Sequence, residues 1–171
     1  MMVRLFCDGM LAGLARWLRA AGCDTALAAR GLRDTDILAA CRAEGRTLLT
    51  RDRRLAAVAA GDVPTVLVES DAVDEQARQV GAALWLDWMA APFTRCMVDN
   101  APLRPATGES AARIPERARR LPGPFRVCPA CGRVYWPGSH ARRIAARLQA
   151  WREAVAAERR ATAHEALSGR G

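Results

Sequence analysis

Two aspartates, Asp8 and Asp52, come directly after segments that predict β-strands, at residues 3–7 and 47–50. Parallel strands end at the same edge of a sheet, so the two carboxylates converge if the strands are neighbours. Carboxylates that lie close together repel each other, and they stay ionised together when a cation neutralises them. Hard oxygen ligands favour Mg²⁺ or Mn²⁺ over thiophilic metals. The spacing therefore predicts a divalent-metal site, which can activate water and neutralise a phosphodiester.

A third acid is expected from the start of the second predicted helix, which begins at the same edge. Asp34 and Asp36 are both candidates, and the spacing leaves the choice between them open. Asp71, after the fourth predicted strand, is a further candidate, for which a surface loop is the simpler explanation. Each acid alone also has a structural explanation, because aspartate is common in helix caps and turns. Their shared edge favours the metal site.

A second constellation contains cysteine. Cys128 and Cys131 form a C-P-A-C knuckle, and Cys96 lies upstream of it, with Asp99 three residues later. Two such pairs are typical of a tetrahedral zinc site. Three alternatives stay open for the fourth ligand: Asp99 supplies it, His140 supplies it, or the site binds zinc weakly or not at all. A redox C-x-x-C is disfavoured, because the knuckle is not at a strand-to-helix junction near the first strand.

Cys7, Cys23 and Cys41 stand alone in apolar segments, which predicts buried, reduced thiols.

The elements that would position the acids alternate along the first half of the chain. Apolar spacing predicts strands at residues 3–7, 25–28, 47–50 and 63–68, and helices at residues 9–21, 36–44, 53–60 and 74–88. This alternation predicts an α/β fold with a doubly wound parallel sheet. Strand order 2-1-3-4 would place the first and third strands beside the crevice.

Pro92 marks a change in composition. We predict a domain at residues 1–90, a zinc-ribbon-like region rich in Pro, Gly and Arg at 91–138, and a basic C-terminal helix and tail at 139–171, helical to about residue 163. The ribbon would present a set of arginines to RNA: Arg113, Arg117, Arg119, Arg120, Arg126 and Arg133. Tyr135 and Trp136 would either stack on unpaired bases or form the core of the ribbon.

The net charge is +8, and every basic residue is arginine. GC-rich coding alone could explain that bias, whereas the functional interpretation is binding of a polyanion such as nucleic acid. Arg16, Arg51, Arg53 and Arg54 lie near the acids in sequence and are predicted to bind substrate phosphates. No apolar run is long enough to span a membrane, and the first residues do not resemble a signal peptide, so we expect a cytoplasmic protein.

Two long motifs carry a family resemblance. The segments F-C-D-G-M-L-A-G-L-A-R-W-L-R-A-A-G-C-D-T and G-R-T-L-L-T-R-D-R-R-L, with Y-W-P-G-S-H near the end, resemble the Mut-seven C-terminal ribonuclease domain family, a PIN-like fold with a C-terminal zinc ribbon. The resemblance implies that Asp8 and Asp52 are metal ligands or catalytic acids, with a further acid at the start of the second helix. It also implies a cysteine where this chain has Asp99.

The first hypothesis is a ribonuclease that uses Mg²⁺ or Mn²⁺ at the acidic site to hydrolyse RNA, with zinc at the ribbon. The second is a non-catalytic RNA-binding module whose acidic crevice is idle. The third is a toxin-like PIN nuclease that needs an antitoxin partner, for which nothing in the chain marks a partner surface.

Overall fold

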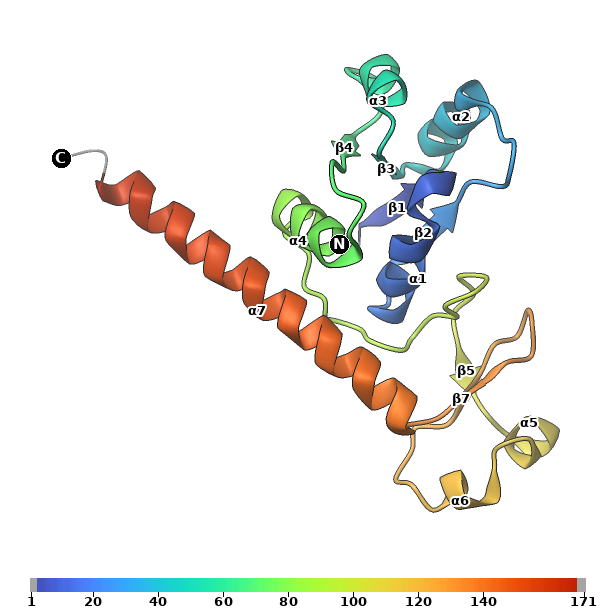
Figure 1. Cartoon of the computed structure of the whole chain (residues 1–171). Helices are drawn as coiled ribbons and strands as arrows, with labels where there is room; N and C mark the ends of the chain where they lie inside the picture. Colours follow the sequence, from blue (N-terminus) through green and yellow to red (C-terminus); the bar gives the residue numbers. More distant parts are fainter. Residues whose placement is uncertain (1–2, 169–171) are drawn as a thin grey trace.

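A computed structural model describes residues 3–168 of the chain (Figure 1). Its main sheet has four parallel strands in the order β2-β1-β3-β4, which confirms the predicted α/β fold and strand order. The strands are β1 (Arg4–Cys7), β2 (Asp24–Leu27), β3 (Thr47–Thr50) and β4 (Thr65–Leu67). The carboxyl ends of β1 and β3 are therefore neighbours, as the metal-site prediction requires.

Helices connect the strands, as the alternating pattern predicts. A 3₁₀ turn, η1 (Gly9–Leu11), leads into α1 (Ala12–Ala20), and the other helices are α2 (Asp34–Glu44), α3 (Arg53–Ala59) and α4 (Val73–Leu84). Several predicted boundaries differ from the structure: the first predicted helix opens with the 3₁₀ turn η1, the fourth strand is shorter than predicted, and the last helix runs to Ser168 rather than about residue 163. Two further differences concern α2 and α4. The second helix begins at Asp34 rather than Asp36, and the helix expected to reach residue 88 ends at Leu84. It ends there because Trp85 adopts the left-handed conformation, with φ of 55°.

The second half of the chain forms a small antiparallel sheet and one long helix. The sheet has the order β5-β6-β7, and two short helices lie between β5 and β6. These elements are β5 (Arg104–Pro105), α5 (Gly108–Ala112), α6 (Glu116–Arg119), β6 (Arg126–Val127), β7 (Val134–Tyr135) and α7 (Ser139–Ser168). The predicted three-part division of the chain remains a proposal, and residues 1–2 and 169–171 of it lie outside the described residues.

Helix α7 packs along α4 and completes the core of the main sheet (Figure 1). Leu148 and Trp151 are buried in the same cluster as the apolar face of α1. The Trp151 ring meets Trp17 and Trp88 edge-on, with centroids 5.0 and 4.9 Å apart. Edge-to-face pairs of this kind stabilise a core beyond the area that they bury. The C-terminal helix is thus part of the fold that holds the sheet.

Buried polar contacts join the cysteine-bearing loop to the sheet. Arg19 of α1 is 5% exposed, and its guanidinium donates to the carbonyls of Thr25 (2.9 Å), Val98 (2.6 Å) and Met97 (3.5 Å). Asn100 accepts from the backbone amide of Thr25 (3.0 Å). The loop that carries Cys96 and Asp99 is therefore bonded directly to α1 and β2.

The isolated cysteines are buried and free, as predicted. Burial raises the pKa of both Cys23 and Cys41 to about 11, and it also raises the pKa of Cys7. These thiols are therefore protonated at neutral pH and serve as small apolar side chains.

None of the helices among the described residues combines the length and apolar composition that a membrane span requires.

Candidate functional site

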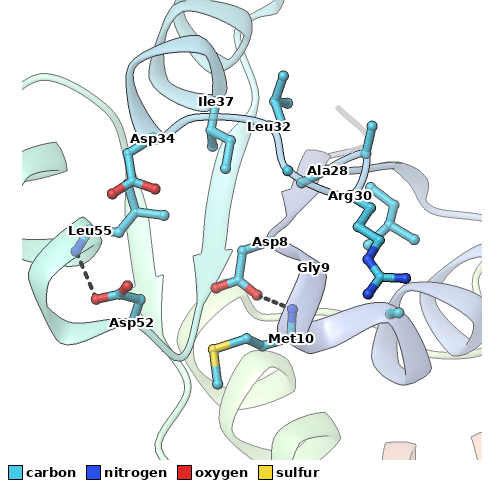
Figure 2. Close-up of a pocket in the computed structure, with 14 residues that line it drawn as sticks. Asp8, Gly9, Met10, Ala28, Arg30, Leu32, Asp34, Ile37, Asp52 and Leu55 are labelled. Atoms are coloured by element: carbon cyan, nitrogen blue, oxygen red, sulfur yellow. Dashed lines mark hydrogen bonds between the residues drawn. The ribbon is translucent and has the colours of Figure 1, made fainter.

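A pocket of about 460 Å³ opens at the carboxyl edge of the parallel sheet. Three aspartates from separate segments line it: Asp8 follows β1, Asp34 begins α2 and Asp52 follows β3 (Figure 2). The structure thus brings Asp8 and Asp52 together at one edge, as their positions after the strands predict. The pocket lining comes mostly from the segments that follow β1, β2 and β3, so the pocket spans the carboxyl ends of these three neighbouring strands.

Asp8 is the most firmly held of the three acids. It is 5% exposed, and one carboxylate oxygen accepts a hydrogen bond from the backbone amide of Met10 (2.8 Å). The other oxygen accepts from the backbone amide of Arg51 (3.1 Å) and from the hydroxyl of Thr50. Both oxygens therefore have protein donors, which fix the orientation of the carboxylate at the base of the pocket.

Thr50 links two of the acids. It is the last residue of β3 and is fully buried; its hydroxyl donates to Asp8 and accepts from the backbone amide of Asp52 (2.9 Å). Thr50 is not among the residues that the sequence pattern predicts to be functional. Its position beside Asp52 at the end of a predicted strand is the signal that could have identified it.

Asp52 caps the start of α3. A single carboxylate oxygen accepts from the backbone amides of Arg54 (2.7 Å) and Leu55 (3.1 Å), so the other oxygen remains available to a ligand. Asp52 can therefore serve both as a helix cap and as a ligand, because the capping bonds orient its side chain toward the pocket (Figure 2).

The structure separates the two candidates for the third acid. Asp34, in the first turn of α2, lines the pocket, whereas Asp36 is not among the lining residues. Asp36 instead accepts two hydrogen bonds from the Arg33 guanidinium (2.9 and 3.0 Å), and these bonds lower its pKa. Asp71 is exposed and does not line the pocket either. Geometry therefore favours Asp34.

The pocket suits a hard divalent cation by its donors and its charge. Its lining includes three carboxylates and one cationic side chain, Arg30, which leaves a formal charge of −2 (three negative, one positive). Among the described residues, the ligand atoms of Cys96, Asp99, Cys128 and Cys131 lie within 4.8 Å of one another. The three carboxylates of the pocket are not gathered as closely as that. A Mg²⁺ or Mn²⁺ ion would therefore retain several water ligands, as Mg²⁺ commonly does.

The four arginines predicted to bind substrate are not among the pocket-lining residues. Arg16 and Arg54 are exposed, and Arg53 forms an ion pair with Glu69 (3.1 Å). Arg51 is half-buried; its amide holds Asp8, while its Nε atom is buried with no hydrogen-bond partner among the described residues. Their contact with substrate remains a prediction.

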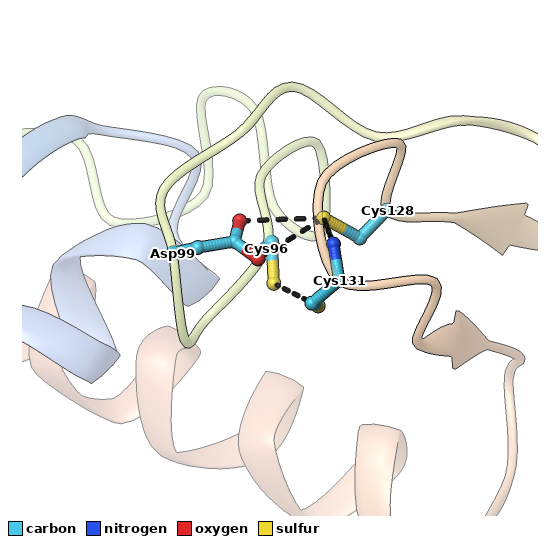
Figure 3. A group of neighbouring side chains, drawn as sticks. All are labelled: Cys96, Asp99, Cys128 and Cys131. Atoms are coloured by element: carbon cyan, nitrogen blue, oxygen red, sulfur yellow. Dashed lines mark hydrogen bonds between the residues drawn. The ribbon is translucent and has the colours of Figure 1, made fainter.

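A second candidate site holds the predicted knuckle. One ligand atom from each of Cys96, Asp99, Cys128 and Cys131 lies within 4.8 Å of the others (Figure 3). The Sγ atoms of Cys96 and Cys131 are 3.8 Å apart. In a tetrahedral zinc site with Zn–S bonds of about 2.3 Å, two sulfur atoms lie about 3.8 Å apart. The four side chains could therefore hold a metal such as zinc.

Asp99 occupies the position of the fourth ligand. Both of its carboxylate oxygens lie 3.3 Å from the Sγ atom of Cys128, and hydrogen bonding, first from Cys131, holds its pKa at about 2. His140 is exposed at the start of α7 and does not belong to this group. Among the alternatives that the sequence leaves open, the geometry thus favours the carboxylate.

Tyr135 packs against this cluster. Its hydroxyl lies 3.1 Å from the Sγ atom of Cys96 and accepts from the backbone amide of Met97 (3.3 Å). These contacts favour the ribbon core over base stacking as the role of Tyr135, which stays a prediction. Ligands supported in this way by neighbouring hydrogen bonds are typical of metal sites.

Comparison with known protein families places the chain in one of them. Its sequence matches the family described as the Mut7-C RNAse domain over residues 3–148, which covers most of the chain, so the protein belongs to that family. No curated protein and no solved structure matches the chain. Family membership suggests a ribonuclease-type function and an interaction with RNA.

Proposed function

We propose that this member of the Mut7-C RNAse domain family is a metal-dependent ribonuclease that hydrolyses RNA phosphodiester bonds at the acidic pocket. The observation that carries the proposal is the convergence of Asp8, Asp34 and Asp52 from three chain segments into one pocket. Three carboxylates in one crevice are stable when a cation neutralises them. The family to which the chain belongs supports RNA as the substrate.

The three aspartates have different tasks in this proposal. Asp8, held by hydrogen bonds to both oxygens, provides a fixed negative charge at the base of the pocket. Asp34 and Asp52 stand at the rim and offer oxygens that can bind the ion or orient its water ligands. When bound, Mg²⁺ or Mn²⁺ activates water at neutral pH and neutralises charge on the phosphate.

The positive charge of the chain would hold the RNA. With a net charge of +8, binding would release counterions from phosphates and would weaken steeply with salt. Arg16, Arg51, Arg53 and Arg54, and the arginines of the ribbon, are the proposed phosphate contacts. This electrostatic term contributes affinity without sequence specificity.

The cysteine cluster would hold zinc in a structural role. It joins Cys96 and Asp99 to the knuckle at Cys128 and Cys131, which lies 29 or more residues later. The segment between them has few buried side chains, so a metal there would order it. A site closed by four protein ligands is typical of structural rather than catalytic zinc.

The test is cleavage of labelled single-stranded RNA and DNA of the same sequence, with Mn²⁺ or with chelator. We expect cleavage of RNA that requires the metal and is abolished in Asp34→Asn. Asp34→Asn is a cleaner test than Asp8→Asn. Both oxygens of Asp8 accept hydrogen bonds, so the NH₂ group of an asparagine there would face another donor and disturb the fold. RNA left intact by the folded wild-type protein would contradict the proposal.

One observation favours the alternative of a non-catalytic RNA-binding module. Both oxygens of Asp8 already accept protein hydrogen bonds, which reduces their availability to a metal ion. A binding module would shift RNA in a gel, with strong salt dependence, and leave it intact in Mn²⁺.

A further inference from the structure

Arg30 stands apart from the other arginines near the acidic pocket. It is the only cationic side chain that lines the pocket, and Figure 2 shows it on the other side of Asp8 from Asp34 and Asp52. No ion pair or side-chain hydrogen bond joins it to another residue of the described part of the chain. Its neighbour Arg33, by contrast, is paired with Asp36. The Arg30 guanidinium is thus free to bind an anion in the pocket.

The backbone fixes the position of Arg30. The loop after β2 is joined to β1 by a hydrogen bond from the amide of Ala28 to the carbonyl of Cys7 (2.9 Å). The amide of Leu32 then donates to the carbonyl of Ala29 (3.1 Å), and Gly31 has φ of 79°. These values match a type II turn with glycine at its third position, which leaves Arg30 at the second. The guanidinium is therefore presented by an ordered turn beside Asp8.

The same pocket has an apolar part. Met10 and Leu32 line it and are 61% and 38% exposed, so two of the five large apolar side chains exposed in the described residues are here. Ile37, Leu27 and Ala28 add to the apolar lining of the pocket. Exposed apolar side chains around a few polar groups are typical of a ligand site. The guanidinium complements a phosphate and the apolar side chains complement a base, so together they match two parts of a nucleotide.

We propose that Arg30, Met10 and Leu32 form a nucleotide subsite that selects unpaired RNA. Arg30 binds a phosphate beside the scissile one, through the paired donors with which guanidinium recognises phosphate, and the apolar side chains pack against the base. A base can reach this wall only when it is unstacked, as in single-stranded RNA. The inference rests on the proposed ribonuclease function, and it names the substrate class and the residues that recognise it.

The test measures binding rather than cleavage. A short labelled single-stranded RNA is titrated with wild-type protein, Arg30→Gln and Arg33→Gln, in Ca²⁺ and in chelator, and a gel confirms that the RNA stays intact. Arg33→Gln is the matched control, because it removes an exposed arginine of the same loop that does not line the pocket. We expect Arg30→Gln to weaken binding about tenfold in Ca²⁺, since hydrogen bonds to a charged group are lost. The control should change it by less than about twofold.

A second comparison tests the selection of unpaired RNA. Leu32→Asn should weaken binding of single-stranded RNA but leave binding of a duplex of the same sequence unchanged. Equal losses in Arg30→Gln and Arg33→Gln, no binding of single-stranded RNA by the wild-type protein, or equal effects on duplex and single strand would each overturn the subsite. If RNA binds through Arg30 but is never cleaved in Mn²⁺, the subsite stands and the ribonuclease proposal fails. If RNA is cleaved equally by wild type and Arg30→Gln with unchanged affinity, the subsite alone fails.

Discussion

The hydroxyl of Thr50 donates a hydrogen bond to the carboxylate of Asp8, so the last residue of β3 fixes the acid that follows β1. The same hydroxyl accepts from the amide of Asp52. A single buried side chain therefore sets the relative position of two acids that are far apart in sequence. Its removal should therefore lower both stability and activity.

Thr50→Val keeps the shape of the side chain and removes the hydroxyl. We expect the free energy of unfolding to fall by about 1–2 kcal/mol, because Asp8 and the amide of Asp52 each lose a partner. The RNA cleavage rate should fall about tenfold or more as the carboxylate loses its orientation. Denaturant unfolding and single-turnover cleavage measure the two effects. Thr50→Ser, which restores the hydroxyl, should recover both.

Asp99 is predicted to be a ligand of bound zinc. Elemental analysis should find about one zinc per chain in the wild-type protein and clearly less in Asp99→Ala after dialysis, since one of four ligands is lost. Asp99→Cys should retain zinc against a chelator better than the wild type. Cys41→Ala, which alters a buried thiol outside the cluster, serves as the control. Unchanged zinc content and affinity in Asp99→Ala would argue against the carboxylate ligand.

Arg19 connects the cysteine loop to the parallel sheet, so its removal should affect both the stability of the fold and the cysteine cluster. Arg19→Met fills similar space but leaves the carbonyls of Thr25 and Val98 without their donor. We expect a loss of roughly 3 kcal/mol in unfolding free energy and weaker zinc retention. Thermal unfolding with and without a zinc chelator checks this. If Arg19→Met lost stability but kept full zinc affinity, the loop would be positioned independently of Arg19.

Asp24 makes the free energy of unfolding depend on pH in the acidic range. Burial disfavours its charged form, but hydrogen bonds from Arg46 and Asn100 outweigh that cost and lower its pKa from 3.8 to about 2. A lowered pKa stabilises the folded state above about pH 4, and this stability, roughly 2 kcal/mol, is lost as the pH falls toward 2. Asp24→Asn should therefore be less stable than wild type at pH 7, with the difference shrinking toward pH 2. Urea unfolding across that range measures the difference, and a constant gap would contradict it.

The sequence was sufficient for the sheet and its acidic edge, because strand and helix patterns alternate and Asp8 and Asp52 directly follow strands. It could not choose between Asp34 and Asp36, since that choice depends on where α2 begins and on the pairing of Asp36 with Arg33. Arg51, Arg53 and Arg54 were predicted to bind substrate because they are adjacent to Asp52 in sequence, yet they do not line the pocket.

Arg30 was missed because a loop residue carries no periodic signal, and the turn that presents it depends on contacts with β1. The end of α4 was missed for a related reason: Trp85 ends the helix in a conformation that glycine usually adopts. In both cases tertiary contacts decide what local sequence does not show.

In the proposed function, Asp8, Asp34 and Asp52 act as one metal-dependent site. The most direct measurement is the single-turnover cleavage rate of labelled single-stranded RNA in Mn²⁺ for wild type, Asp34→Asn and Asp36→Asn. The two variants change acids of the same helical turn, one that lines the pocket and one that does not. We predict a loss of about 100-fold or more for Asp34→Asn and less than about threefold for Asp36→Asn. Equal rates for the two variants, or full activity in Asp34→Asn, would show that Asp34 does not belong to a metal-dependent site.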